Sequence, residues 1–318
     1  MRTTATSTRS IETGHGRLVF PCFMPVTTFG GAFPLDVVAR PYLSRFAPAL
    51  MASHYYAQSM KKPERPNHPL FVDSGGFASL FEGSSVEEHG DMACICTKYG
   101  KPLHPAEVLT FQQEYADIGA TLDFLIPPGT DEQEAKHKQG LTIKNALWAA
   151  GHHVVESSMR LFASLQAWNA ESAKQITEKL AALNFDGFAL GGMVPRVRTP
   201  KVIFEIIGAI REIETDRPLH VFGIGNPKLI RALFEQGVDS VDSSSFLQNA
   251  VNKRYLDPHR GEFVPLDEVG SAIKACPCRV CQTLDVEYLR LEGALNNLAL
   301  ALHNLAALHS YCGLERTE

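Results

Sequence analysis

Three cysteines lie within six residues in the last fifth of the chain, Cys276, Cys278 and Cys281, and His303 follows them in a stretch of helical character. Three thiolates and one imidazole complete a tetrahedral zinc shell with no position open to water, which is typical of structural Zn²⁺. A free-thiol cluster or a redox pair is the alternative, but three cysteines at this spacing favour metal. His309, six positions further on, is a rival fourth ligand that would point to another helix face.

The composition is that of a folded, water-soluble chain. It has 318 residues, of which 45% are hydrophobic and 20% charged, enough for one large domain. The net charge of −5 gives no overall attraction for nucleic acid, so a polyanion would need a local basic patch. No apolar run is long enough to cross a bilayer, and Met1–Thr13 lacks the apolar core of a signal peptide. We therefore expect a cytoplasmic protein with no membrane partner.

Short β-branched or aromatic runs recur along most of the chain and alternate with helical patterns. The alternation predicts a parallel sheet, and eight units in roughly 250 residues predict an α/β fold, a (β/α)8 TIM barrel. An open doubly wound sheet is the alternative, but the first predicted strand has no glycine-rich dinucleotide loop after it. The predicted strands are Phe23–Thr27, Ala49–Ser53, Leu70–Asp73, Leu122–Ile126, Leu161–Gln166, Gly187–Leu190, Leu219–Phe222 and Ser240–Asp242. The predicted helices between them are Pro105–Ile118, Asp131–Ser158, Ala170–Leu183, Pro200–Ile213 and Pro227–Gln236.

Two further segments complete the predicted organisation. We expect the catalytic barrel to span residues 1–256 and an appended zinc-binding subdomain to span 257–318, with one long helix at about Asp285–Ser310 packed on the barrel. Residues Phe77–Lys101 are rich in Gly, Ser, Glu and His and are expected to form a long loop. A loop of that length in a compact domain usually serves as a lid or binding element.

Polar residues and glycines stand where the predicted strands end, and the active site of a barrel is built at that end. Each alone could cap or turn the chain, and Asp239 is expected to be structural. Together, one carboxylate as nucleophile and another as acid/base suit cleavage of a glycosidic bond through a covalent intermediate. A third carboxylate, an amide and backbone groups suit reading the edge of a planar heterocycle. The set comprises Asp73, Asp123, Gln166, Gly191, Gly192, Met193, Gly225 and Asp242.

Several motifs resemble the tRNA-guanine transglycosylase family over most of the chain. They are Phe20–Val26, the Asp73–Phe77 segment D-S-G-G-F, Gly225-Asn226-Pro227, Gly237–Ser243, and the C-x-C-x2-C motif with the later H-N-L. Members of the family replace guanine in a polynucleotide by a 7-deazaguanine. The resemblance implies that Asp242 attacks the ribose anomeric carbon, that Asp73 is the general acid/base, and that His303 rather than His309 completes the zinc shell.

The resemblance also implies a base-binding set. Asp123 and Gln166 would read the base edge with backbone groups of Gly191, Gly192 and Met193, near Gly225, and Phe77 and Phe222 would sandwich a preQ0- or preQ1-like base. Lys253 and Arg254, just beyond the nucleophile strand, are expected to contact phosphates.

Some positions depart from the family. Ala78 stands where a glutamine is common, and Ser243–Tyr255 is closer to archaeal-type members than to the arginine- and glycine-rich bacterial stretch. Neither that stretch nor the archaeal C-terminal RNA-binding domains are seen, so the acceptor is tRNA or, as in DNA-modifying relatives, DNA. A non-catalytic nucleic-acid-binding subunit is a competing hypothesis, which the three aspartates argue against. A barrel glycosidase acting on free sugars leaves the zinc motif unexplained. A homodimer or an accessory protein is a possible assembly.

Overall fold

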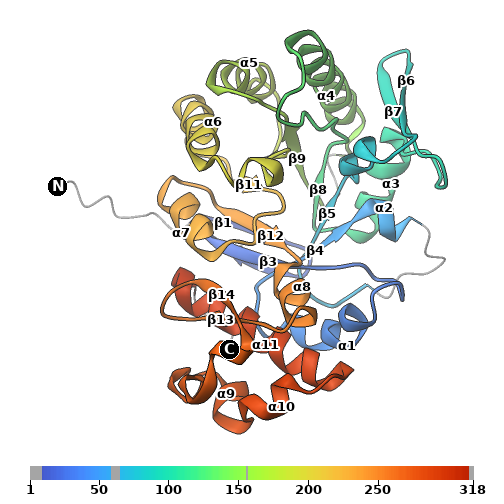
Figure 1. The fold of residues 1–318 in the computed structure, drawn as a ribbon. Coiled ribbons are helices and arrows are strands. Elements are labelled where there is room, and N and C mark those ends of the chain that lie inside the picture. The colour runs from blue at the N-terminus through green and yellow to red at the C-terminus, as the bar shows by residue number, and fades with distance from the viewer. Residues whose placement is uncertain (1–8, 59–64, 155–156, 315–318) are drawn as a thin grey trace.

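Eight parallel strands close into a barrel in the order β10-β11-β12-β3-β4-β5-β8-β9 (Figure 1). A computed structural model of the chain describes residues 9–58, 65–154 and 157–314. The predicted α/β barrel is therefore confirmed, and the open sheet is excluded. The strands are β3 (Cys22–Thr27), β4 (Leu50–Ser53), β5 (Leu70–Asp73), β8 (Ile118–Ala120), β9 (Arg160–Leu165), β10 (Gly187–Leu190), β11 (Leu219–Val221) and β12 (Ser240–Ser243).

The fourth predicted strand is wrong, whereas the other seven overlap barrel strands. Leu122–Ile126 follows β8 and does not pair with a neighbouring strand. Its backbone N–H groups bind side chains instead: Phe124 N–H donates to Thr142 Oγ1, and Ile126 N–H donates to Gln166 Oε1. Periodicity alone does not separate a short buried strand from a buried loop.

The barrel helices begin at residues that satisfy their first backbone donors. Asp131 accepts from the N–H groups of Gln133 and Glu134, and Asn169 forms a capping box with Ser172. All five predicted helices are present, with α4 ending at His152; residues 155 and 156 of that prediction lie outside the described residues. The helices are α1 (Pro34–Leu43), α2 (His54–Ala57), α3 (Pro105–Tyr115), α4 (Glu132–His152), α5 (Ala170–Ala181), α6 (Pro200–Ile213), α7 (Pro227–Glu235) and α8 (Ser245–Val251).

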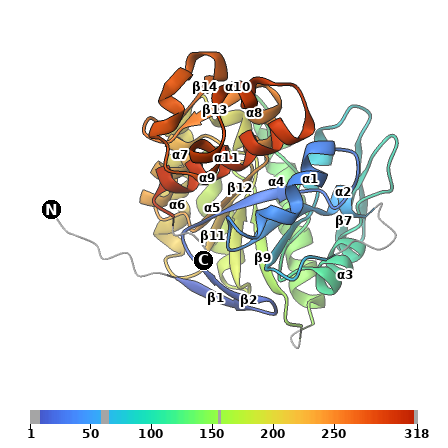
Figure 2. The same ribbon diagram turned by 90° about the horizontal axis from the view of Figure 1, so that it is seen from below.

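The N-terminal end of the barrel is closed by a hairpin, β1 (Ser10–Thr13) and β2 (Gly16–Val19), which Figure 2 shows at the edge of the barrel. Leu18 and Phe20 are buried with the inward-facing residues of the barrel, among them Phe71 and Phe162. The strand interiors are so crowded that a Cβ at Gly187 would lie 2.5 Å from the Phe162 ring. The interior is therefore packed, and only the opposite end is available for a site.

The segment predicted as a long loop, Phe77–Lys101, contains regular structure. A 3₁₀ turn, η1 (Gly76–Leu80), leads into the hairpin β6 (Ser85–His89) and β7 (Met92–Cys96). Asn145 of α4 donates to Ala93 O and accepts from Ala93 N–H. The loop prediction is wrong. Strand β6 is polar and exposed, so its sequence resembles a loop, although it pairs with the buried strand β7.

The single long C-terminal helix is also a wrong prediction. Gly293, with φ +152°, separates α10 (Val286–Arg290) from α11 (Ala294–Cys312). Before them come the hairpin β13 (Arg254–Asp257) and β14 (Glu262–Pro265), the 3₁₀ turns η3 (Leu266–Glu268) and η4 (Gly270–Ala275), and α9 (Arg279–Thr283). Helix α11 contacts α1, α7 and α8, so the C-terminal segment lies against the flank of the barrel (Figure 1). Among the described residues, no helix has the length and apolarity to cross a membrane.

Candidate active site

Asp242 lies in β12 with one carboxylate oxygen held and the other free. Its Oδ1 is 3.0 Å from His220 Nε2 and accepts from Gly223 N–H at 2.9 Å. A carboxylate only accepts, so a neutral His220 carries its proton on Nε2 and accepts at Nδ1 from Ser240 Oγ, 2.8 Å away. Within the described part of the chain, no hydrogen bond reaches Asp242 Oδ2. This oxygen is available as a nucleophile.

Asp73 ends β5 and has the titration expected of an acid/base. Burial raises the pKa of its carboxyl to about 7, against the lowering effect of the hydrogen bond from Gly75 N–H. The nearby carboxylates of Asp242 and Asp123 raise the pKa further. A group with a pKa near neutrality can both give and take a proton at physiological pH.

Asp123 and Gln166 form a buried polar pair beneath two glycine backbones. Gln166 Nε2 donates to Asp123 Oδ2 at 2.6 Å, and Ser74 Oγ donates to Asp123 Oδ1 at 2.9 Å. Burial raises the pKa of Asp123, while these hydrogen bonds lower it. A Cβ at Gly76 would lie 2.1 Å from Asp123 Oδ1, and one at Gly191 would lie 2.2 Å from Gln166 Nε2. Glycine at these positions lets the backbone pass directly over the pair.

The strand order places the site residues on opposite sides of the mouth. Strand β12, with Asp242, stands across the barrel from β8, which Asp123 follows. Phe77 follows β5 and Phe222 follows β11, which are also opposite. Two carboxylates and two aromatic residues therefore stand at opposite strands around the same barrel.

Aromatic side chains extend outward from Phe77. Its ring centroid lies 6.0 Å from that of Tyr56 in a stacked arrangement and 5.3 Å from that of Phe81. Tyr55 touches all three of these rings, and Phe33 packs edge-on against Tyr56. Phe33 and Phe81 are exposed. We call these five residues the aromatic rim.

Three further predicted residues, Gly225, Lys253 and Arg254, lie beyond the ends of β11 and β12. A Cβ at Gly225 would lie 2.3 Å from Ser245 Oγ, so glycine there allows β11 and α8 to approach. The ammonium of Lys253 is bound by Leu289 O, Leu291 O and Asn297 Oδ1. Its three donors are thus committed to the C-terminal segment. Arg254 is exposed and bonds only Phe263 O among described residues.

Sequence reasoning missed His220 and Arg196. His220 pairs in register with Ser240, and strand alternation puts Ser240 and Asp242 on one face. A histidine between Leu219 and Val221 in an inward-facing register was therefore a usable signal. Arg196 is buried at the start of the segment after β10, where the sequence offers no periodic pattern.

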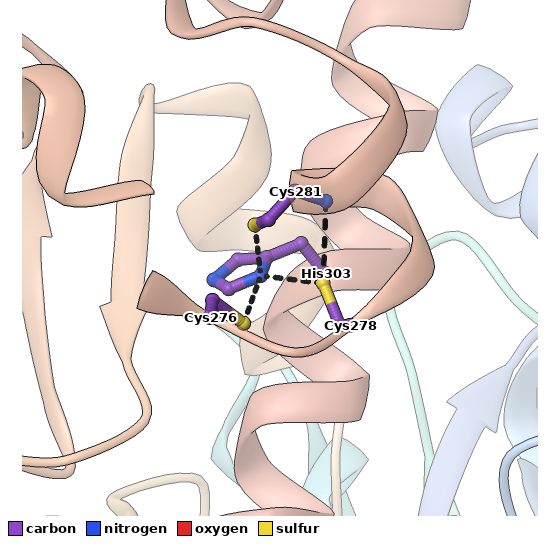
Figure 3. Close-up of side chains that lie close together, drawn as sticks. All are labelled: Cys276, Cys278, Cys281 and His303. Atoms are coloured by element: carbon purple, nitrogen blue, oxygen red, sulfur yellow. Dashed lines mark hydrogen bonds between the residues drawn. The ribbon is translucent and has the colours of Figure 1, made fainter. Parts of the chain in front are cut away.

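The four predicted metal ligands converge in one buried cluster, with Cys276 and Cys278 before α9, Cys281 within it and His303 on α11 (Figure 3). The three sulfurs lie 3.2–3.7 Å from His303 Nδ1, and all four ligand atoms are within 4.8 Å of one another. Ligands about 2.0–2.3 Å from a tetrahedral ion are separated by roughly 3.5 Å, so the donor set fits zinc.

The surroundings of the cluster orient its histidine. His303 Nε2 is 2.9 Å from Leu256 O, which leaves Nδ1 for a metal, and the Tyr255 ring stacks on the imidazole at 3.9 Å. His309 packs edge-on against Phe23 and is outside the cluster. The cluster thus contains His303, the histidine that the resemblance implied, and not His309. The group is buried and can hold a metal ion.

Comparison with known proteins covers almost the whole chain. The sequence profile of a family described as queuine tRNA-ribosyltransferase matches residues 4–316. The chain belongs to this family. It is thereby an enzyme of the glycosyltransferase class, as the resemblance of its motifs implied.

Individual relatives in the queuine tRNA-ribosyltransferase family come from bacteria and archaea. A protein named queuine tRNA-ribosyltransferase from Solidesulfovibrio magneticus is 28% identical over 94% of this chain and 86% of its own length. A tRNA-guanine(15) transglycosylase from Pyrococcus furiosus is 29% identical over 93% of this chain, and one from Methanocaldococcus jannaschii is 30% identical over 85%. The chain spans 49% and 42% of these two archaeal relatives. It therefore matches about half of each archaeal protein.

Proposed function

We propose that the protein exchanges guanine in a nucleic acid for a preQ0- or preQ1-like 7-deazaguanine through a covalent aspartyl-ribosyl intermediate. The observation that carries the proposal is the free Oδ2 of Asp242 facing a mouth that also holds Asp73, whose pKa is raised to about 7. A nucleophile that is ionised beside an acid that holds its proton is the division of roles this chemistry needs.

The exchange takes two balanced steps. In the first, Asp242 Oδ2 bonds to C1′ of the target nucleotide, the C1′–N9 bond breaks, and its electron pair leaves with guanine, which takes a proton from Asp73. In the second, Asp73 takes the N9 proton of the incoming base, N9 bonds to C1′, and the ester bond to Asp242 breaks. His220 and Gly223 bind Oδ1 throughout, so they hold the carboxylate and stabilise its charge when it leaves.

Base recognition rests on the buried pair. Asp123 would accept from N1–H and the exocyclic amine of guanine, while Gln166 and the Gly192 backbone address O6 and position 7. Phe77 and Phe222 would add stacking that is indifferent to base identity, on the order of 1–3 kcal/mol per base. Discrimination against adenine then comes from polar groups that adenine would leave unpaired.

The aromatic rim supports a nucleic acid with unpaired bases as the acceptor. Exposed aromatic faces beside a catalytic mouth suit the stacking of bases next to the target nucleotide. Arg254 lines an open hollow of about 530 Å³ with Asn226 and Asn249, in which Lys228 is ion-paired with Glu262, so we assign the phosphate contact to Arg254. Lys253 is committed to the C-terminal segment, so we assign it a role in holding that segment. The acceptor is tRNA or DNA, and the experiment below separates the two.

We assign zinc to Cys276, Cys278, Cys281 and His303, as a structural ion that completes a subdomain of residues 257–318 on the barrel of residues 1–256. With four protein ligands it offers no site for substrate. We further propose a cytoplasmic protein that works as a homodimer or with an accessory protein.

The test is incorporation of labelled guanine into tRNA and into single- and double-stranded DNA, with Asp242→Asn as the matched variant. Wild type should label one polymer, and Asp242→Asn, which keeps the shape of the side chain, should label none while remaining folded. Equal labelling by both proteins would remove the covalent mechanism. Binding of a polymer without labelling by wild type would favour the non-catalytic subunit.

A further inference from the structure

The chain turns back on itself between β7 and α3, and two backbone hydrogen bonds close the turn. Ile95 N–H donates to Leu103 O at 3.1 Å, and Leu103 N–H donates to Ile95 O at 2.8 Å. Both residues are fully buried, so the two ends of the turn are anchored in the core. We call residues 96–102 the tyrosine loop, because Tyr99 is at its centre. A loop whose ends are fixed loses less conformational entropy when it binds a partner.

The loop presents an aromatic ring to solvent. Tyr99 is 88% exposed, the largest fraction among the large hydrophobic side chains that the structure describes. Lys98 Nζ lies 5.0 Å from the centroid of this ring. The Lys98 stem runs past Gly83, where an added Cβ would lie 3.2 Å from Lys98 Cδ. A single exposed ring needs no explanation, so its meaning depends on what lies beside it.

The tyrosine loop adjoins the aromatic rim. A Cβ on Gly100 would lie 3.7 Å from Tyr55 Oη and 3.8 Å from Tyr55 Cε2. The Tyr55 ring in turn lies 5.6 Å from that of Phe77 and 5.2 Å from that of the exposed Phe81, centroid to centroid. The aromatic surface that starts at the mouth of the barrel therefore reaches the tyrosine loop.

The loop also carries positive charge that no carboxylate neutralises. Lys98 and Lys101 are exposed, and neither is in an ion pair with a carboxylate in residues 9–58, 65–154 or 157–314. On the neighbouring strand β6, Glu87 is paired with a histidine and Glu88 with a lysine of α4. The chain as a whole has a net charge of −5, so this is a local basic site. Aromatic rings beside lysines are the surface that single-stranded nucleic acid prefers.

We propose that the tyrosine loop binds unpaired nucleotides of the acceptor strand on one side of the target guanine. A base stacks on Tyr99, and Lys98 and Lys101 contact phosphates. The loop follows β5, whereas Arg254 follows β12, and β3 and β4 lie between these two strands. The acceptor strand then crosses the mouth between two separate docking points. The inference rests on the proposed function and adds to it a requirement for single-stranded sequence on the loop side, since a duplex hides the faces of its bases.

The experiment measures binding by fluorescence anisotropy of RNA and DNA oligonucleotides that carry one guanine and are extended on its 5′ side or on its 3′ side. Tyr99→Ala should bind one of the two extended strands about tenfold more weakly than wild type does and should bind the other equally well. Annealing a complement to the sensitive extension should abolish the difference between the two proteins. Tyr42→Ala is the control, because Tyr42 is also an exposed ring with a cation, Arg45, 5.8 Å from its centroid. It should keep the wild-type affinity for both strands.

The lysines have a test of their own. The double variant Lys98→Gln/Lys101→Gln should reduce the slope of log Kd against log salt concentration by about 1.4, the value for two lost phosphate contacts on a single strand. Lys179→Gln/Lys201→Gln, which changes two exposed lysines on outer helices, should keep the wild-type slope. Equal slopes for wild type and the loop variant would contradict the phosphate contacts.

The outcomes separate this inference from the proposed function. A wild type that exchanges guanine, with a Tyr99→Ala variant that binds both extended strands as wild type does, would overturn the role of the loop and leave the function intact. A wild type that exchanges guanine in neither polymer would remove the function, while the anisotropy measurements would still decide the role of the loop. A Tyr99→Ala variant whose sedimentation changes while its binding of both strands does not would assign the loop to contact with a second copy of the chain, and would also overturn the inference.

Discussion

Asp242 is held at one oxygen by two donors, and the histidine donor is available to mutation. His220→Phe keeps a ring of similar size in the barrel but removes the hydrogen bond to Oδ1. We expect kcat to fall about 10²-fold with KM little changed, since the lost donor acts on the charge of the carboxylate rather than on substrate binding. His220→Gln, which can still donate, should recover part of kcat. Steady-state kinetics of the two variants would show this, and equal loss in both would reduce His220 to a packing role.

Asp73 should make stability depend on pH in a direction opposite to that of a salt-bridged aspartate. Its folded pKa is raised to about 7 from 3.8, so the folded state binds the proton more tightly than the unfolded state does. That contribution is fully present below about pH 4 and is lost as pH rises through 7. Asp73→Asn resembles the protonated form, so its Tm should come closest to that of wild type near pH 4, exceed it increasingly as pH rises to about 7, and keep that advantage at pH 8. Thermal melts across this range provide the measurement; a Tm gap that is constant with pH would contradict the raised pKa.

At the scale of elements, Asn145 joins helix α4 to the β6–β7 hairpin and to the segment after β8. It exchanges two hydrogen bonds with Ala93 and donates a third to Leu122 O, all buried. Asn145→Ala should cost about 2–4 kcal/mol in the free energy of unfolding, because buried backbone groups lose their partners. Asn249→Ala removes a single part-buried bond to Ser245 O and serves as the control, with a loss below about 1.5 kcal/mol. Urea unfolding of both variants would test the difference.

How far the sequence predicts the elements depends on what fixes each one. β5 and β10 were predicted with their observed bounds, because a short apolar run ends at Asp73 and before Gly191. The carboxylates of Asp73 and Asp242 were singled out because their strand ends are visible in the sequence, whereas Asp123 was placed in a predicted strand that is a segment after β8. Arg196 was missed because its partner is the backbone carbonyl of Gly192, and the direction of a carbonyl in a loop leaves no pattern in the sequence. The break at Gly293 was missed because glycine inside an apolar helical stretch reads as a tolerated residue.

On the scale of the whole molecule, the cysteine cluster ties α9 to α11, which in turn packs on α1, α7 and α8. Binding free energy of a structural zinc is folding free energy, so Cys278→Ser should lose metal and lower stability before it changes the chemistry. Cys312→Ser, also on α11 but outside the cluster, should keep its zinc. Elemental analysis and thermal melts of both variants would test this, and a fully metal-loaded Cys278→Ser protein would count against the assignment.

The hairpin β1–β2 closes one end of the barrel. This closure bears on the order in which two bases could leave and enter at the open end. With Leu18 and Phe20 packed against the inward-facing side chains, no second route runs through the interior. In the proposed exchange, the departing guanine and the arriving base would use the same open end. The first base would then leave before its replacement enters, while the sugar stays bonded to Asp242. The closed end thus fits the proposed double displacement, in which the two bases do not occupy the site together.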